Sequence, residues 1–550
     1  MASGACEEVD YTAERPYHRQ GDDPTHLPPG NLSAHGLAEY SPQTAATIPV
    51  PSKHPPLDQL FGVPAPPPSL ICPQRFPGID SEATDVLIKT LEDNHVRWHI
   101  FFNYKGFHNH AAHHLLAIWA MGASGPVIDA AYVTHCEYQR PAFESPGHIT
   151  QSNVFKHLGD ERYYSAYLDF FTTEILKKGL SECLEEYVFS PHANFSRNFA
   201  EEQPEMLSRF VEGVFHPLIH TGYGAEFGLV GISAEGLAMT AVHGANPDLL
   251  SRSWFPDVIS SPTGKGSKRS ALSILALVAC DPRFSNIKKT EDESMYAQVL
   301  KEQGSVLQEY AQMWVIDISS GIGIAEAAEG LSWLNTIIYG VGGYSAGKPF
   351  KGDFFLMHLL TSSLFLPSLL LSIPKYSSRR LLLLTYFTAS LAYYLARGRP
   401  RLDVRSFYKG TGQLLHKVPG PSPSPAPKTL PKPTSDHALT PNGWFSVIQT
   451  TLVHPNEHLC KAQRALAHYS TLYGVRKKGW CAPPTKEGRM VSDAQLAREE
   501  EAEGKMGLEE LDGTLFLRVA MLTLHRLGWM REGETEKEWD FDGFFDDDVR

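Results

Sequence analysis

The chain has 550 residues, of which 42% are hydrophobic and 11% aromatic, so it is long enough to bury a large core. Its formal net charge is −13, which argues against nucleic acid as a partner, because clustered Lys and Arg hold phosphate backbones. The seven cysteines are far apart and include no CxxC pair, so they indicate neither a disulfide framework nor a zinc ribbon. This cysteine pattern is typical of a reducing compartment.

The N-terminus carries no apolar stretch like that of a secretory signal and is too acidic for a typical mitochondrial presequence. We therefore expect a cytoplasmic protein. Two apolar runs, 354–373 and 381–395, resemble either membrane spans or the buried helices of a large core. The second run is too short to cross about 30 Å of hydrocarbon, and the first is interrupted by His358, Thr361 and Pro367. These features favour buried helices, and no membrane partner is expected.

Residues 1–78 are rich in Pro, Gly, Ser and His and have no sustained period, which predicts an extended arm that either wraps the domain or stays disordered. Helical periodicity starts near residue 80, where Ser81 is the expected N-cap. A second helix follows residue 110 and ends near Gly122. Further helices are predicted at residues 163–176, 203–224, 232–241, 294–316, 354–371, 381–395 and 454–473. Alternating strand patterns are scarce, so the expected fold class is all-α.

Two later segments interrupt this helical pattern. Residues 419–436 form a Pro/Ser/Lys tract, PGPSPSPAPKTLPKPTSD, which predicts a flexible insertion. Residues 531–550 are acidic with scattered aromatics, as in a solvated tail. We therefore expect one large helical catalytic domain over residues 79–530, with a central metal site.

Histidines occur at four places in apolar, helix-forming sequence. They are His110 with His114 and His216 with His220, each pair four residues apart, then a lone His358, and finally His458 one turn before Lys461. Helices that each bring one histidine to a common centre could build a metal site for iron, zinc or copper. Such histidines could equally be hydrogen-bonded core residues. Asp353 and Glu457 neighbour two of them and are either partners that orient the rings or helix caps.

Signatures of other cofactors are missing from the sequence. The glycine-rich segment 339–347 lacks the βαβ setting of a dinucleotide-binding fingerprint, and no GxxxxGK[ST] loop occurs. Residues 231–236 only loosely resemble a nucleophile elbow and are not GxSxG. The sequence therefore supports neither a Rossmann-bound flavin or nicotinamide nor ATP chemistry.

The four histidine segments, in this order, resemble the questin oxidase-like family of fungal polyketide pathways. The matching stretches are GFHNH at 106–110, FHPLIH at 215–220, FLMHLLTS at 355–362 and EHLCK at 457–461, within a resemblance that runs from about residue 93 to 473. It implies a dioxygen-dependent, Baeyer–Villiger-type enzyme that opens an anthraquinone ring. It also implies mononuclear non-haem Fe(II), with ligands at His110, His216, His358, His458 and a carboxylated Lys461.

A protonated lysine cannot ligate a cation, whereas a carbamate on Lys461 would supply an anionic oxygen on the same helix face as His458. The alternative is an ordinary surface lysine.

Other residues near the histidines are candidates for catalysis. Thr361 lies one turn after His358, so its hydroxyl either faces the metal or bonds the preceding turn. His220 and His114 are candidate acid/base or ring-orienting groups, and Tyr223 is a candidate contact for a phenolic substrate. The remaining histidines in these segments, His108, His113 and His454, are expected to be structural.

The sequence and the resemblance together predict an oxidoreductase that acts with dioxygen on a small aromatic polyketide in fungal secondary metabolism. A metal-dependent hydrolase and a non-catalytic scaffold of a biosynthetic complex are the alternatives. The sequence leaves open the choice between a monooxygenase and a dioxygenase, the use of NADPH as reductant, and the oligomeric state.

Overall fold

The computed structural model describes residues 55–196, 202–255, 269–285, 287–289, 294–314, 317–481 and 493–545. Within these ranges the regular elements are helices, α1 to α19 with short 3-10 and π turns between them, and pairing between extended segments is limited to isolated bridges. The prediction of an all-α fold is confirmed.

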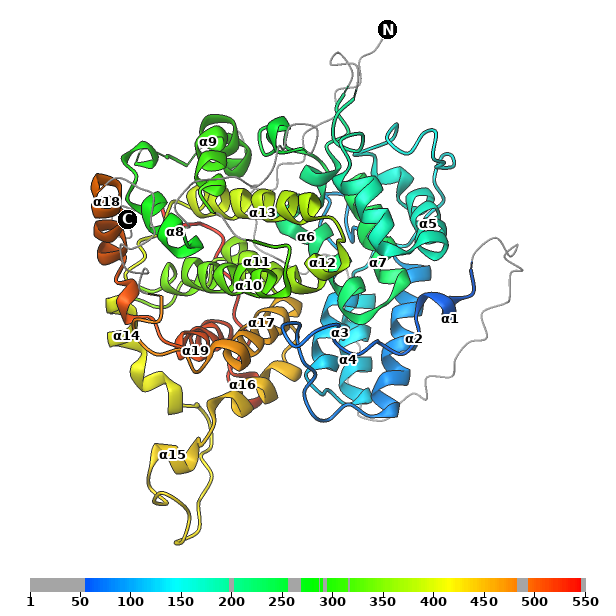
Figure 1. Ribbon diagram of the computed structural model, residues 1–550. Coiled ribbons are helices and arrows are strands. Elements are labelled where there is room, and N and C mark those ends of the chain that lie inside the picture. The colour runs from blue at the N-terminus through cyan, green and yellow to red at the C-terminus, as the bar shows by residue number, and fades with distance from the viewer. Residues whose placement is uncertain are drawn as a thin grey trace, which may run out of the picture.

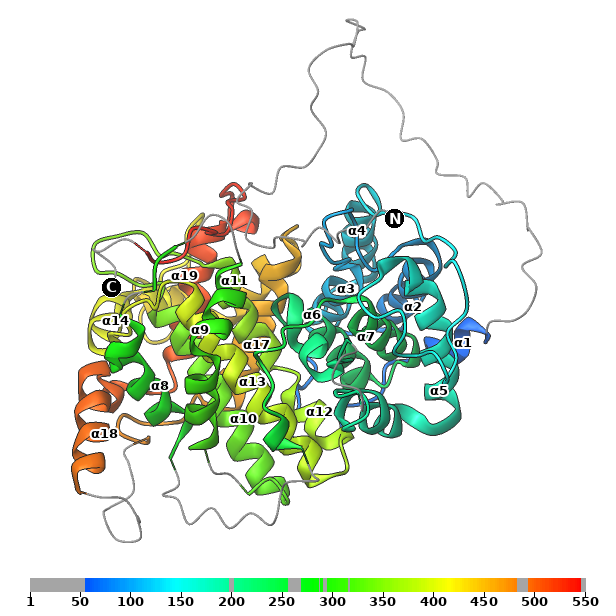
Figure 2. The ribbon, with the colours of Figure 1, turned by 90° about the horizontal axis from the view of Figure 1, so that it is seen from above.

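The helices form two halves that lie side by side (Figures 1 and 2). The first half contains α1 (Leu57–Leu60), α2 (Ser81–Arg97), α3 (Ala111–Ala120), α4 (Gly125–Cys136), α5 (Tyr164–Leu184), α6 (Met206–Phe227) and α7 (Val230–Val242). The second half contains α8 (Ala271–Cys280), α9 (Met295–Gln312), α10 (Gly321–Thr336), α11 (Phe354–Ser363), α12 (Leu366–Ser372), α13 (Tyr376–Ala396), α14 (Val404–Thr411), α15 (Asp436–Leu439), α16 (Gly443–Leu452), α17 (Glu457–Tyr473), α18 (Asp493–Met506) and α19 (Leu515–Leu527). At the junction, α3 and α6 of the first half pack against α17 and α11 of the second.

The N-cap of the first long helix lies one residue before the predicted one. The Asp80 side chain accepts a hydrogen bond from the Ala83 amide at 2.8 Å, so Asp80 is the N-cap and Ser81 is the first helical residue. Aspartate caps a helix as well as serine does, and the prediction of Ser81 was wrong. The α3 helix ends at Met121, followed by Gly122 in the left-handed region with φ +88°. A side chain on Gly122 would collide with the Pro77 carbonyl.

Two of the predicted helices are interrupted. In α6 the backbone leaves the helical region from Glu212 to Phe215. The predicted helix over residues 354–371 consists of two helices, α11 and α12, bent by 45°. Pro367 lies in the first turn of α12, where its missing N–H leaves no intrahelical bond unmade.

The two apolar runs form core helices. Every residue of α11 except Phe355 is buried, and so is every residue of α13 from Leu381 onward. Among the described residues, no single helix has both the length and the apolarity that a membrane span needs, although α11 and α12 taken as one bent pair meet that test.

The described parts of the arm and of the tail pack on the helical body. Leu60 and Phe61 are buried, and the Ala65 amide donates to the Phe227 carbonyl at 2.7 Å. At the other end, the Phe354 amide donates to the Asp540 carbonyl at 2.9 Å, so this part of the predicted solvated tail contacts the start of α11. Residues 1–54 and 546–550 lie outside the described residues. The mostly exposed tract 419–436 belongs to the yellow hairpin that projects beside α15 in Figure 1.

Candidate metal centre

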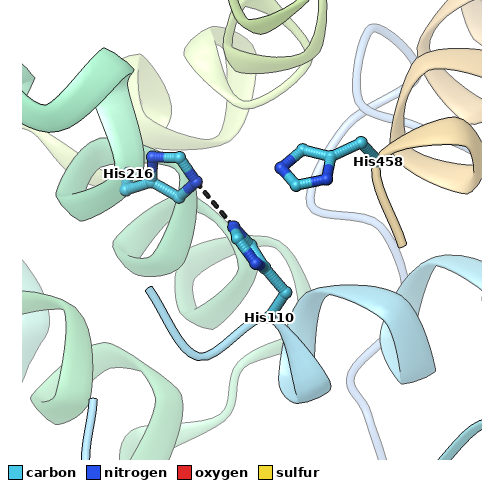
Figure 3. A group of neighbouring side chains, drawn as sticks. All are labelled: His110, His216 and His458. Atoms are coloured by element: carbon cyan, nitrogen blue, oxygen red, sulfur yellow. Dashed lines mark hydrogen bonds between the residues drawn. The ribbon is translucent and has the colours of Figure 1, made fainter. Parts of the chain in front are cut away.

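Four helices at the junction each bring one histidine to the same place. His110 is the N-cap of α3, His216 follows the non-helical stretch of α6, His358 lies in the middle of α11, and His458 is the second residue of α17. None of the four is more than 3% exposed. We call these four residues the four-histidine cluster, and Figure 3 shows three of its rings pointing toward one another.

The rings of the cluster form a closed circuit of short contacts. The Nε2 atoms of His110 and His216 are 2.8 Å apart. Ring centroids are 4.5 Å apart for His110 and His458, 4.9 Å for His216 and His358, and 5.0 Å for His358 and His458. One nitrogen from each of His110, His216 and His458 lies within 4.8 Å of the other two, which is compatible with ligation of one ion.

Backbone carbonyls fix the orientation of two of these rings. His216 donates through Nδ1 to the Gly213 carbonyl at 2.5 Å, and His358 donates through Nδ1 to the Phe354 carbonyl at 2.7 Å. Because a carbonyl can only accept, Nδ1 must carry the hydrogen on both rings. The Nε2 lone pair of each neutral ring is then available as a ligand, as in metal sites where an outer partner sets the tautomer.

Glu457 lies between the other two rings and is within hydrogen-bond distance of His458 only. Its Oε1 lies 3.2 Å from His458 Nδ1 and 3.6 Å from His110 Nδ1. Burial alone would raise the pKa of Glu457, but the neighbouring His458 lowers it below its ordinary value, so the carboxylate is charged. Asp353, predicted to be either a ring-orienting partner or a helix cap, is a helix cap. It caps α11 through the Leu356 amide and pairs with Arg397.

Several buried polar atoms of the site have no hydrogen-bond partner within the described part of the chain. One of them is Nδ1 of His110, and the other three are Nε2 of His358, Nε2 of His458 and Nζ of Lys461. An unpaired buried polar group costs about 1–3 kcal/mol. Three such atoms beside the cluster therefore need a further ligand, and imidazole nitrogens are donors for iron, zinc and copper.

Lys461 is buried beside the cluster, with 1% of its surface exposed. Burial lowers the pKa of its amine to about 8. Burial and the neighbouring Lys461 also lower the pKa of His458 to about 4, so this ring is neutral at neutral pH. The alternative of a surface lysine is therefore wrong, and the donor set fits a bound cation.

Two other predicted catalytic residues, Thr361 and Tyr223, lie near the cluster. The Thr361 hydroxyl donates to the His358 carbonyl at 3.2 Å, which leaves its oxygen free to accept. Tyr223 stacks on His113 with ring centroids 5.0 Å apart. Its hydroxyl is buried without a hydrogen-bond partner among the described side chains and backbone groups, and burial raises its pKa.

His220 belongs to a second buried array, which we call the histidine–glutamate chain: His95, Glu235, His220 and His113. His220 Nε2 lies 2.7 Å from one Glu235 oxygen, and His95 Nδ1 lies 2.5 Å from the other. His220 Nδ1 lies 3.0 Å from His113 Nε2. Burial would raise the pKa of Glu235, but the bonds from His220 and His95 lower it to about 2. Neither Glu235 nor His95 was predicted as a functional residue, because the only signal in the sequence is a glutamate within an apolar helix.

The remaining histidines point to other partners. His114 Nδ1 lies 3.1 Å from His135 Nε2, so its ring is paired away from the cluster. His108 Nε2 lies 3.0 Å from His243 Nε2 while its ring stacks on His216 with centroids 3.9 Å apart. His454 Nε2 lies 3.3 Å from the Leu527 carbonyl. His108, His113 and His454 therefore have packing and hydrogen-bonding partners of the kind a structural histidine needs.

The fold and the cluster define an all-helical protein with a buried, imidazole-rich centre that fits a transition metal. Residues 107–466 match the model of the family described as questin oxidase-like, and the chain belongs to that family. The matched region contains the whole cluster and Lys461.

Curated relatives carry names that agree with this family. The chain is 30% identical over 308 residues to the Baeyer-Villiger monooxygenase AacuH of Aspergillus aculeatus, an alignment covering 52% of this chain and 63% of that protein. It is 28% identical over 332 residues to the Baeyer-Villiger oxidase ptaJ of Pestalotiopsis fici, covering 58% and 70%. It is 25% identical over 409 residues to the questin oxidase of Aspergillus terreus, covering 72% and 82%.

Proposed function

We propose that the protein is an oxidoreductase that uses dioxygen to open a ring of an anthraquinone or related aromatic polyketide in fungal secondary metabolism. The observation that carries this proposal is the convergence of four oriented imidazoles beside an unpaired buried lysine. The names of the relatives, which include Baeyer-Villiger oxidases and a questin oxidase, support ring opening as the outcome.

The proposed cofactor is one non-haem Fe(II), held by the four-histidine cluster and Lys461. Iron supplies the redox chemistry that lets dioxygen, a triplet molecule, react with a closed-shell aromatic ring. Lys461 contributes by its low pKa: a neutral amine can attack carbon dioxide, forming an N–C bond and releasing one proton. The resulting carbamate has anionic oxygens that offset the charge of the cation.

The surrounding residues keep these donors in place. The Gly213 and Phe354 carbonyls and the Glu457 carboxylate hold a proton on Nδ1 of His216, His358 and His458, so Nε2 of each of these rings stays a lone-pair donor. The Thr361 oxygen, one turn from His358, can accept a hydrogen bond from a water or a substrate hydroxyl. Burial of the cluster excludes bulk water and strengthens these interactions.

We propose His220 as an acid/base group that acts through the histidine–glutamate chain. Its Nδ1 faces His113, whose ring centroid is 5.8 Å from that of His110, and its Nε2 is held by Glu235. Tyr223 stacks on the same His113 ring and is a candidate contact for a phenolic substrate.

The test is turnover of a panel of hydroxylated anthraquinones by the iron-loaded full chain, in air and without oxygen, with and without NADPH. We expect ring-opened product only in air and none from a His358→Ala variant. Labelled dioxygen distinguishes a monooxygenase, which inserts one labelled atom, from a dioxygenase, which inserts two. Conversion without dioxygen would contradict the proposal and favour a metal-dependent hydrolase. A folded protein that binds neither iron nor substrate would favour a scaffold.

A further inference from the structure

A second feature of the junction is a small cavity next to the kink of α6. Its volume is about 50 Å³, and its lining includes Glu212, Tyr296, Phe355, Tyr393 and Arg397. The first four come from α6, α9, α11 and α13, and Arg397 is the C-cap of α13. None of them belongs to the proposed ligand set, so this cavity is distinct from the centre of the cluster.

Two polar groups on the cavity wall are buried without a hydrogen-bond partner in the described ranges: Oε1 of Glu212 and the hydroxyl of Tyr296. They are close enough for the Glu212 charge to raise the pKa of Tyr296 further, although burial is the larger cause. Burial raises the pKa of Glu212 to about 8, so this carboxyl is protonated at neutral pH and can donate. Buried groups of this kind normally have partners, which indicates that a ligand supplies them.

The inner wall of the cavity is the strained part of α6. Gly213, Val214 and Phe215 have φ values of 53°, 55° and 66°, a left-handed conformation that is unfavourable for a β-branched or aromatic residue. The conformation is held by the bond from the Val214 amide to the Tyr393 hydroxyl at 3.2 Å. Backbone strain that the surroundings hold in place is a frequent property of binding sites.

The same strained stretch connects the cavity to the four-histidine cluster. Gly213 lines the cavity, and its carbonyl accepts the hydrogen bond from His216 Nδ1. A side chain at Gly213 would come within 2.2 Å of His243 Nε2 and 3.1 Å of His108. A group in the cavity is therefore separated from His216 by one stretch of backbone.

The chemistry of the walls selects the kind of group that fits. Tyr393 stacks on Tyr296 with ring centroids 4.0 Å apart, and the Arg397 guanidinium lies 4.4 Å from the centroid of the Phe355 ring. Arg397 is already paired with Asp353 at 2.9 Å, so its charge is offset. A neutral polar group between aromatic walls suits this surface better than an anion does.

We propose that this cavity receives the hydroxyl-bearing edge of a neutral phenolic aromatic compound, with Glu212 and Tyr296 as its hydrogen-bonding partners. The volume admits one polar edge, and the rest of the ring system extends toward the opening. The identification of this compound as the substrate rests on the proposed function. The binding of the compound in the cavity does not.

The test measures binding of 1,8-dihydroxyanthraquinone to the full chain by quenching of tryptophan fluorescence. We expect Glu212→Leu to raise the Kd at least about tenfold, which is the loss of about 1.4 kcal/mol, and Tyr296→Phe to raise it about threefold. Glu212→Gln keeps a donor and should stay within about threefold of wild type. Glu309→Leu, an exposed substitution on α9, is the matched control and should leave the Kd unchanged. Anthraquinone without hydroxyls should bind more weakly and should not distinguish the Glu212 variants.

Melting temperatures separate a binding role from a structural one. Removing a buried carboxyl with an unpaired oxygen should leave the unliganded Glu212→Leu variant as stable as wild type or more stable. Unchanged affinity in a folded Glu212→Leu variant overturns the proposal. If that variant does not fold, unchanged affinity in Tyr296→Phe overturns it instead.

Repeating the titration after chelation separates this inference from the proposed function. A Glu212-dependent Kd in protein that never binds iron supports the cavity and contradicts the iron centre. A protein that binds iron but whose Kd does not depend on Glu212 supports the iron centre and contradicts the cavity.

Discussion

The four-histidine cluster and the histidine–glutamate chain begin in the same places yet differ in how their nitrogens are used. His110 and His113 lie at the start of α3, and His216 and His220 are one turn apart in α6. In the chain, both nitrogens of His220 and both oxygens of Glu235 have partners. In the cluster, Nδ1 of His216, His358 and His458 faces an acceptor, while Nε2 of His358 and of His458 has no partner within the described residues. The paired atoms of His220 and Glu235 stabilise the fold, whereas the oriented but unpaired Nε2 atoms of the cluster are available to bind a cation.

The largest expected effect is on the cluster. His358→Ala should reduce turnover to the level of a protein-free control, because His358 Nε2 is one of the proposed ligands. In the metal-free protein the substitution removes only the Nδ1 hydrogen bond to the Phe354 carbonyl, a cost of about 0.5–1.5 kcal/mol, since Nε2 has no partner among the described residues.

The control for this variant is His454→Ala, which removes a buried ring bonded to backbone groups only. It should keep both iron and turnover, with circular dichroism confirming that both variants fold. Full activity in a folded His358→Ala variant would contradict the account.

Glu212 is a buried acid with an unpaired oxygen, and unlike the unpaired Nε2 atoms of the cluster it holds a proton at neutral pH. Burial raises its pKa from 4.5 to about 8, so its contribution to stability is fully present below pH 4.5. Between pH 4.5 and 8 the unfolded chain releases the proton while the folded chain keeps it. Wild type should therefore lose stability relative to Glu212→Gln as pH rises through this window, by at most about 5 kcal/mol. Urea unfolding of both metal-free proteins from pH 5 to 8 measures the difference, and parallel curves would show that Glu212 is charged in the folded state.

In the histidine–glutamate chain, we expect the loss of a charge to change stability but not metal binding. Glu235→Gln should lower the free energy of unfolding by about 3 kcal/mol, because it removes a buried carboxylate that accepts hydrogen bonds from both His220 and His95. Iron binding should persist, since Glu235 contacts none of the proposed ligands. Denaturant unfolding and metal analysis of the same sample check both parts. Loss of iron at unchanged stability would mean that the histidine–glutamate chain is part of the metal centre.

Glu457→Gln tests the residue that lies between two rings of the cluster. The variant keeps the size of the side chain but removes the negative charge next to His458 Nδ1 and His110 Nδ1. We expect iron affinity to fall about 10- to 100-fold, as for other partners of ligating histidines. Competition with a chelator measures the affinity, and an unchanged value would show that the Glu457 carboxylate does not support the ligands.

The sequence predicted the helical class from its periodicity. That the four histidine segments meet was implied by the family resemblance, because spacing alone left hydrogen-bonded core histidines as an alternative. The sequence did not predict the pairing of His95 with Glu235, 140 residues away, because nothing local marks either residue. The helix α10 was missed because its glycines and alanines give no clear periodic pattern. The packing of the tail depends on contacts that only the folded chain brings together, such as the bonds from the Phe354 amide to the Asp540 carbonyl and from the Phe544 amide to the Arg397 carbonyl.

The kink of α6 could not be predicted from the sequence either. The run from Met206 to Phe227 reads as one continuous helix, and the left-handed residues Val214 and Phe215 depend on tertiary contacts such as that with Tyr393. Pro217 is the only local sign of an interruption. The cavity beside the kink therefore appears only when α6, α9 and α13 are placed together.

The central claim is that the cluster and Lys461 hold one iron, and metal content tests it most directly. The full chain, loaded with Fe(II) and freed of excess metal, would be measured beside His458→Ala and Lys461→Met, with circular dichroism confirming each fold. The account predicts about one iron per chain in wild type and little in either variant. A wild-type protein that retains no iron but turns over substrate fully would contradict it.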